Sequence, residues 1–164
     1  MEKNKKGQSQ IVSTVLLILL VIATVVIVMG FVIPFVKDKL ASGACLDVAG
    51  KIEISSGYTC YDVGDSEMQV QIGIEDIREL IDGFTIELGG ASSESFRIEN
   101  NTQVTDVNMF NGNPILELPP KDNTGRTYVI SNIFDEPDFI EVYPILKGGK
   151  VCGGTSPVTS IEVC

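Results

Sequence analysis

Four cysteines are the side chains of this chain with the clearest chemistry: Cys45, Cys60, Cys152 and Cys164. All four follow a long apolar segment, and an even set in that position favours disulfides formed in an oxidising compartment. Three connectivities are open. We favour Cys45 with Cys60 and Cys152 with Cys164, because the members of each pair are close in sequence. Free thiols or a four-thiolate metal site are the alternatives, and neither pair has the CxxC spacing of a metal site.

Other catalytic or metal-binding chemistry has little support. The chain contains no histidine, so the commonest general base and metal ligand is absent. It has no glycine-rich phosphate loop ending in Lys-Ser or Lys-Thr, and no serine in a nucleophile elbow. Asp62, Asp65 and Glu67 offer oxygen ligands for calcium, but the full loop pattern is missing. We expect no enzyme activity, no catalytic residue, no metal and no cofactor.

One modification motif is present. Asn100 begins the triplet Asn100-Asn101-Thr102, which is an N-x-T acceptor for glycosylation if this part of the chain is exported.

Charge is distributed unevenly along the 164 residues. The net charge is −10, with +2 before the apolar segment and −12 after it. Nucleic-acid binding depends largely on Lys and Arg that neutralise phosphates. An acidic domain of this kind therefore predicts no nucleic-acid partner.

The apolar segment determines on which side of a membrane the cysteines and Asn100 lie. Residues 11–36 form a run of 26 residues without a charge. As a helix the run would be about 39 Å long, more than the ~30 Å core of a bilayer. Three lysines precede it, so the positive-inside rule places the N-terminus in the cytoplasm and the remainder outside.

Three fates are open to such a segment. A secretory signal peptide has a shorter apolar region followed by a cleavage site, and this run is too long for one. An uncleaved signal anchor would hold an outer domain on a single helix. The third fate is cleavage before the apolar run, and it depends on the residues KKGQSQIVSTVLLILLVIA that begin at Lys5.

This string resembles the class III signal peptides of archaeal type IV pilins and archaellins. The resemblance implies that a prepilin peptidase cuts after Gly7, behind the basic Lys5 and Lys6, and leaves Gln8 as the mature N-terminus. It also implies an assembly platform with an ATPase, and identical or homologous pilin subunits as partners. Many pilins carry a glutamate at the position occupied here by Val12. This chain therefore lacks one side chain that could set the alignment of neighbouring subunits.

The domain organisation predicted on this basis has four parts: a leader over 1–7, a membrane and filament-core helix over 8–40, a linker over 41–44 and a head domain over 45–164. Gly30 and Pro34 predict a kink or a loosened turn near the outer end of the helix. The residues expected to pack between subunits are Ile11, Val12, Val15, Leu16, Leu19, Leu20 and Val21.

The head domain shows a period-two apolar pattern, which is typical of strands with one buried face. We expect an all-β, immunoglobulin-like antiparallel sandwich. Residues 75–82 fit a short helix or a tight hairpin, and the flanking strands favour the hairpin. The strands expected are 46–48, 52–54, 68–74, 84–88, 96–98, 115–118, 128–130, 139–145 and 160–163.

The function predicted from these observations is a structural subunit of a type IV pilus-like filament, which passes from the cell membrane to the cell surface. The alternatives are a monomeric, membrane-tethered binding module and a minor pilin that primes or caps the filament. Whether such a filament serves adhesion, motility or DNA uptake is not encoded in these features.

Overall fold

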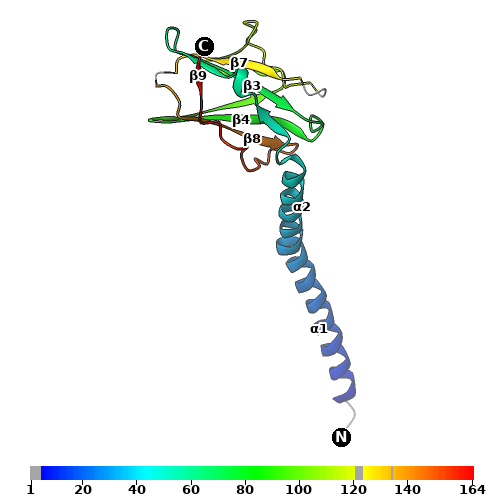
Figure 1. Ribbon diagram of the computed structural model, residues 1–164. Helices are drawn as coiled ribbons and strands as arrows, with labels where there is room; N and C mark the ends of the chain where they lie inside the picture. Colours follow the sequence, from blue (N-terminus) through cyan, green and yellow to red (C-terminus); the bar gives the residue numbers. More distant parts are fainter. Residues whose placement is uncertain (1–4, 121–123, 134) are drawn as a thin grey trace. The chain divides into compact units, whose positions relative to one another are not determined.

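The computed structural model describes residues 5–120, 124–133 and 135–164, with the backbone alone over 5–11 and 37–42. The chain divides after Ser42 into two compact units. The described residues of the first are all helical, and the second, called the β domain below, contains the strands of the described chain (Figure 1).

A long helical segment opens the chain. It consists of α1 (Lys5–Ile27), a π-helical turn η1 (Val28–Val32) and α2 (Ile33–Val48). In the π turn the Ile33 N–H donates to the Val28 carbonyl, five residues back. Pro34 has no N–H and cannot continue a regular bonding ladder, which accounts for the altered turn around Gly30. The π turn includes Gly30, where the sequence predicted a kink or a loosened turn.

The linker expected over 41–44 is wrong, because α2 continues through it to Val48. Leu46 and Val48, expected in a strand, are helical as well. The helix is held at this end by packing, since Ala44 and Cys45 lie against the core and Val48 is 1% exposed. It ends before Gly50, whose positive φ of 73° suits a C-terminal cap.

The larger sheet of the β domain has six strands in the order β6-β7-β3-β2-β9, and β1 pairs with β3 beside β2. All pairs are antiparallel except β2 with β9, which is parallel. That pair departs from the all-antiparallel expectation. The strands are β1 (Ile52–Ile54), β2 (Cys60–Asp62), β3 (Glu67–Ile74), β6 (Val107–Met109), β7 (Arg126–Ile130) and β9 (Glu162–Val163).

Strands β1 and β2 form one edge that is interrupted by the 3-10 turn η2 (Ser56–Tyr58). Both pair with β3, β1 at its C-terminal end and β2 at its N-terminal end. At the interruption, the Gln71 N–H donates to the Thr59 hydroxyl at 3.2 Å. Thr59 is 2% exposed, so its side chain supplies a buried acceptor where the ladder is broken.

The smaller sheet has three strands in the order β5-β4-β8. At one end of it Gly89 lies opposite Phe139, and a Cβ at Gly89 would overlap the Phe139 ring. Glycine is therefore required there by close packing. The strands are β4 (Ile81–Gly89), β5 (Ser93–Glu99) and β8 (Phe139–Leu146).

The two sheets enclose one apolar core, with β3 and β7 on one side and β4 and β8 on the other (Figure 1). Phe84 and Tyr128 meet across it edge to face, with ring centroids 5.6 Å apart. Inward positions on β3 alternate strictly with half-exposed ones, as the period-two pattern predicted. The core side chains that are fully covered include Met68, Val70, Ile72, Ile86, Ile98, Ile130, Ile140 and Val142.

Two further strand expectations are corrected. Residues 115–118 form no strand and make a single bridge between Leu116 and Thr102. Residues 75–82 are neither a helix nor a hairpin: residues 77–80 form a turn in which the Leu80 N–H donates to the Ile77 carbonyl, and residues 81–82 begin β4, which lies in the other sheet. This turn carries the chain from one sheet to the other, and the fully buried Ile77 anchors it in the core.

Candidate functional site

The apolar helix, defined here as Val12–Val36, is the largest exposed apolar surface of the chain that the structure describes. It is 25 residues long with a mean hydropathy of 3.3, and none of it is buried. Its large apolar side chains are between 43% and 74% exposed. Five of the residues expected to pack between subunits lie close together in its N-terminal part and are 51–61% exposed: Val12, Val15, Leu16, Leu19 and Leu20, with Val21 at 49%.

Such a surface cannot stay in water. Burying one large aliphatic or aromatic side chain gains about 1.5–3 kcal/mol, so 19 of them represent some tens of kcal/mol. A folded domain is stable by only about 5–15 kcal/mol. The apolar helix must therefore be covered by lipid or by other protein, and about 37 Å of helix is long enough to cross a bilayer.

Thr24 finds its hydrogen-bond partner within the apolar helix. The Thr24 hydroxyl donates to the Val21 carbonyl at 2.8 Å, which satisfies this side chain without water. The π turn likewise keeps a backbone bond where Pro34 would otherwise interrupt the ladder. These local bonds allow the segment to lie in an apolar environment.

The predicted leader is described only in part. Residues 1–4 lie outside the described residues, and Lys5, Lys6, Gly7 and Gln8 form the first turn of α1. The backbone there is helical and carries no information on cleavage, so the cut after Gly7 stays a prediction.

The four cysteines form two disulfides, but the predicted pairing is wrong. Cys45 is bonded to Cys152, with 5.4 Å between Cα atoms, and Cys60 to Cys164, with 5.0 Å. Both separations lie in the normal range for disulfides. Proximity in sequence failed as a guide because the sheets bring together segments more than 100 residues apart.

The Cys45–Cys152 disulfide joins the end of α2 to the segment after β8. Cys152 is 6% exposed, and its N–H donates to the Pro144 carbonyl at 2.8 Å. In the chain-entropy estimate, closing a loop of this length contributes about 5 kcal/mol. The disulfide fixes the last turns of the helix to the β domain.

The Cys60–Cys164 disulfide holds the C-terminal strand. It lies beside the parallel pair β2–β9, where the Cys164 N–H donates to the Tyr61 carbonyl at 3.1 Å. A two-residue strand has few bonds of its own, so the covalent link keeps β9 on the sheet edge. Once Cys45–Cys152 has formed, the Cys60–Cys164 disulfide closes an effective loop of roughly 27 residues. In the same estimate it contributes about 3.5 kcal/mol to the free energy of unfolding.

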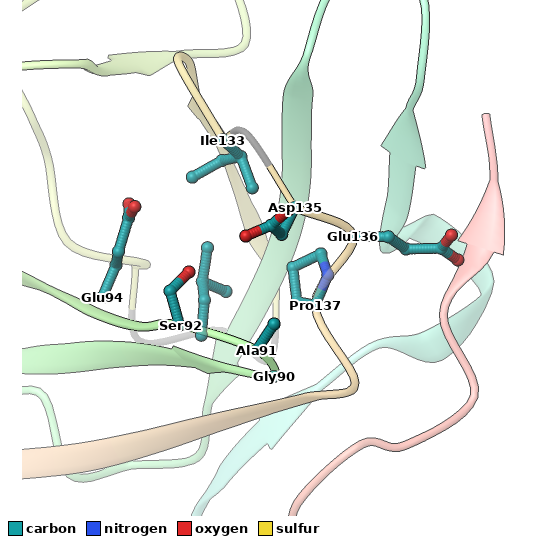
Figure 2. A pocket seen from close by; sticks show the side chains of 9 residues that line it. Gly90, Ala91, Ser92, Glu94, Ile133, Asp135, Glu136 and Pro137 are labelled. Carbon is teal, nitrogen blue, oxygen red and sulfur yellow. The ribbon is translucent and has the colours of Figure 1, made fainter.

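In the β domain, described residues line an open groove of about 520 Å³ beside β1 and residues 154–158, an open hollow of about 360 Å³ at residues 136–138 and 159–161, and one much smaller cavity. A small cavity between the β4–β5 turn and the segment after β7 has a volume of about 10 Å³, enough for one water. Figure 2 shows Glu94 and Asp135 on either side of it and Glu136 extending away. Three scattered carboxylates at so small a cavity do not make a substrate site.

The acidic cluster considered for calcium forms a turn. Asp62 Oδ1 accepts hydrogen bonds from the N–H groups of Gly64 at 2.8 Å and Asp65 at 3.3 Å. Over residues 5–120, 124–133 and 135–164, no group of three His, Cys, Asp or Glu side chains is placed to hold a metal ion.

Asn100 lies in the turn after β5, and its side chain is exposed. Its Oδ1 accepts a hydrogen bond from the Leu118 N–H at 3.2 Å.

Sequence reasoning missed the residues that anchor the helix to the β domain. Ala44, Cys45 and Val48 perform this role from the last turns of α2. The available signal was Gly50, a typical C-terminal cap two residues beyond Val48.

Comparisons with models of protein families, with curated proteins and with solved structures gave no match.

Proposed function

We propose that this protein is a structural subunit of a type IV pilus-like surface filament. The observation that supports this most is a 25-residue apolar helix, none of it buried, near the N-terminus of a chain whose β domain contains two disulfides. Disulfides suit an extracellular domain, and the helix suits a membrane anchor. In the proposal, the helices leave the membrane and pack on one another in the filament core.

The proposed sequence of events begins in the membrane. A prepilin peptidase removes residues 1–7, which takes away the cytoplasmic lysines and keeps the helix. The subunit then passes from lipid into a helical bundle with an assembly platform and its ATPase as partners. Little hydrophobic energy is gained on this transfer, because lipid and bundle are both apolar, so close helix packing and contacts between head domains must stabilise the polymer.

The proposal includes an immunoglobulin-like sandwich for the head domain. Two sheets around one core support it, and the parallel β2–β9 pair is a departure from the simplest form. The strict alternation of β3 and the edge-to-face pair of Phe84 with Tyr128 support a face-to-face arrangement of the sheets.

The test is intact-mass and N-terminal peptide analysis of the protein from native membranes and from sheared surface material. We expect a mature chain that starts at Gln8 in the sheared fraction. A Gly7→Val variant should block the cut and remove the protein from that fraction. An uncut wild-type chain found only in membranes would contradict the proposal and leave a membrane-tethered surface domain.

A further inference from the structure

The turn that follows β5 contains the single N-x-S/T triplet of the chain, Asn100-Asn101-Thr102. Asn100 and Asn101 are exposed, and Thr102 is half-buried. Asn101 has a positive φ of 59°, which asparagine tolerates better than most residues and which turns the chain sharply between its neighbours. The acceptor residue is thus presented at the tip of a turn.

The hydrogen bond of Asn100 sets the direction of its amide. The Leu118 N–H is a donor, so the atom facing it at 3.2 Å must be Oδ1, which accepts. The Nδ2 atom occupies the other corner of the same planar amide, and the side chain is exposed. The nitrogen that a glycosyltransferase would modify is therefore not the atom that holds the turn.

We propose that Asn100 carries an N-linked glycan, transferred outside the membrane from a lipid-phosphate-linked oligosaccharide. In the transfer, Asn100 Nδ2 bonds to the anomeric carbon of the first sugar and loses one proton. The bond between that carbon and the phosphate oxygen breaks, and the lipid phosphate leaves with the electron pair. No oxidant or reductant is required.

The folded turn accommodates the product. Its other bonds join the Asn101 N–H to the Leu116 carbonyl, the Leu116 N–H to the Thr102 carbonyl, and the Thr102 hydroxyl to the Glu99 carbonyl, each at 2.8 Å. None of them uses Asn100 Nδ2, and the modified amide keeps Oδ1 for Leu118. A glycan at this position therefore removes no hydrogen bond of the described turn.

The inference rests on one part of the proposed function, the export of the β domain, and not on filament assembly. The experiment is peptide mass spectrometry of the full-length protein isolated from its own cells, with the oxidation state of the cysteines read from the same digest. We expect the peptide containing Asn100 to carry a hexose- or hexosamine-containing mass, and the cysteine peptides to be disulfide-linked.

Three variants sharpen the result. Asn100→Gln and Thr102→Ala should each lose the added mass completely. Asn101→Gly is the matched control, because it keeps the acceptor triplet and glycine adopts the positive φ without strain. It should retain the added mass.

Each outcome has a defined meaning. An unmodified Asn100 peptide in wild-type protein with oxidised cysteines would overturn the glycan and leave export intact. An unmodified peptide with reduced cysteines would overturn export, and with it the proposed function. An added mass that persists in Asn100→Gln would also overturn the assignment.

Discussion

The helix and the β domain differ in the origin of their order. Every backbone bond of α1 and α2 is local, and no side chain between Val12 and Val36 is buried. The β domain depends on contacts between distant segments, with disulfides that span 107 and 104 residues and core side chains that are fully covered. The helix satisfies its own backbone hydrogen bonds, but its apolar side chains need lipid or another protein to bury them. The β domain buries its apolar side chains in its own core.

A charge in the middle of the apolar helix should have the largest effect. We expect Val25→Arg to remain in the membrane, because the other apolar side chains outweigh a cost of about 2.5–3.5 kcal/mol. In a filament core the same arginine would be buried without a partner, at about 3–5 kcal/mol per subunit or more, and assembly should fall at least 100-fold. The measurement is protein in sheared and membrane fractions.

The matched control is Val63→Arg, which places the same charge on an exposed valine of the β domain. It should leave both fractions at wild-type levels. Normal filament yield from Val25→Arg would contradict packing of this helix between subunits.

Removal of the Cys45–Cys152 disulfide should have the next largest effect. We expect Cys45→Ala with Cys152→Ala to lower the free energy of unfolding by about 3–5 kcal/mol, since the unfolded chain regains the freedom of a long loop. That corresponds to a fall of roughly 10–20 °C in Tm, read by circular dichroism in detergent. A peptide map that joins Cys45 to Cys60 would refute the pairing itself.

The close contact at Gly89 tests the core of the β domain. Gly89→Ala should destabilise by about 1–3 kcal/mol, because the new methyl group overlaps the Phe139 ring. Gly73→Ala on β3 meets no atom within 4 Å and should be neutral or stabilise by up to about 1 kcal/mol. Equal denaturant midpoints for the two variants would contradict the described packing.

Alkaline pH should have the smallest effect. Burial raises the pKa of Tyr128 well above its ordinary value of 10, and the side-chain hydrogen bond to Glu141 raises the pKa of Tyr143 to about 12. Both shifts favour the neutral phenol in the folded state, so their contribution is complete below pH 10 and is lost as the pH rises above it. For Tyr128 we expect about 1 kcal/mol of lost stability between pH 10 and 11.

Tyr128→Phe separates this effect from general alkaline damage. The variant loses the hydrogen bond to the Glu117 carbonyl, but it should show a flatter loss of stability between pH 10 and 11. In a titration followed by phenolate absorbance, the variant should also lose the step that occurs at the highest pH, which belongs to Tyr128. An unchanged pH profile would assign the loss to other groups.

Local pattern predicted much of the β domain. The strands around Val70, Phe84, Tyr128 and Val142 were predicted from alternating apolar residues, because one face of each strand meets the core. The short strands β2 and β6 were missed, whereas β1 and β9, which are also short, lie within strands that the sequence predicted. Leu46 and Val48 were assigned wrongly to a strand. Two apolar residues in alternation cannot distinguish a strand from the last turn of a helix.

The sequence by itself determined the apolar helix, its loosened turn at Gly30 and Pro34, the acidic character of the β domain and the presence of four cysteines that can pair. Each follows from residue type or from neighbours within a few positions. Tertiary structure alone decided that Cys45 meets Cys152, that β9 runs parallel to β2, and that the turn after β3 changes sheets. These depend on which distant segments share a core, and a period in the sequence gives the face of a strand but not its neighbour.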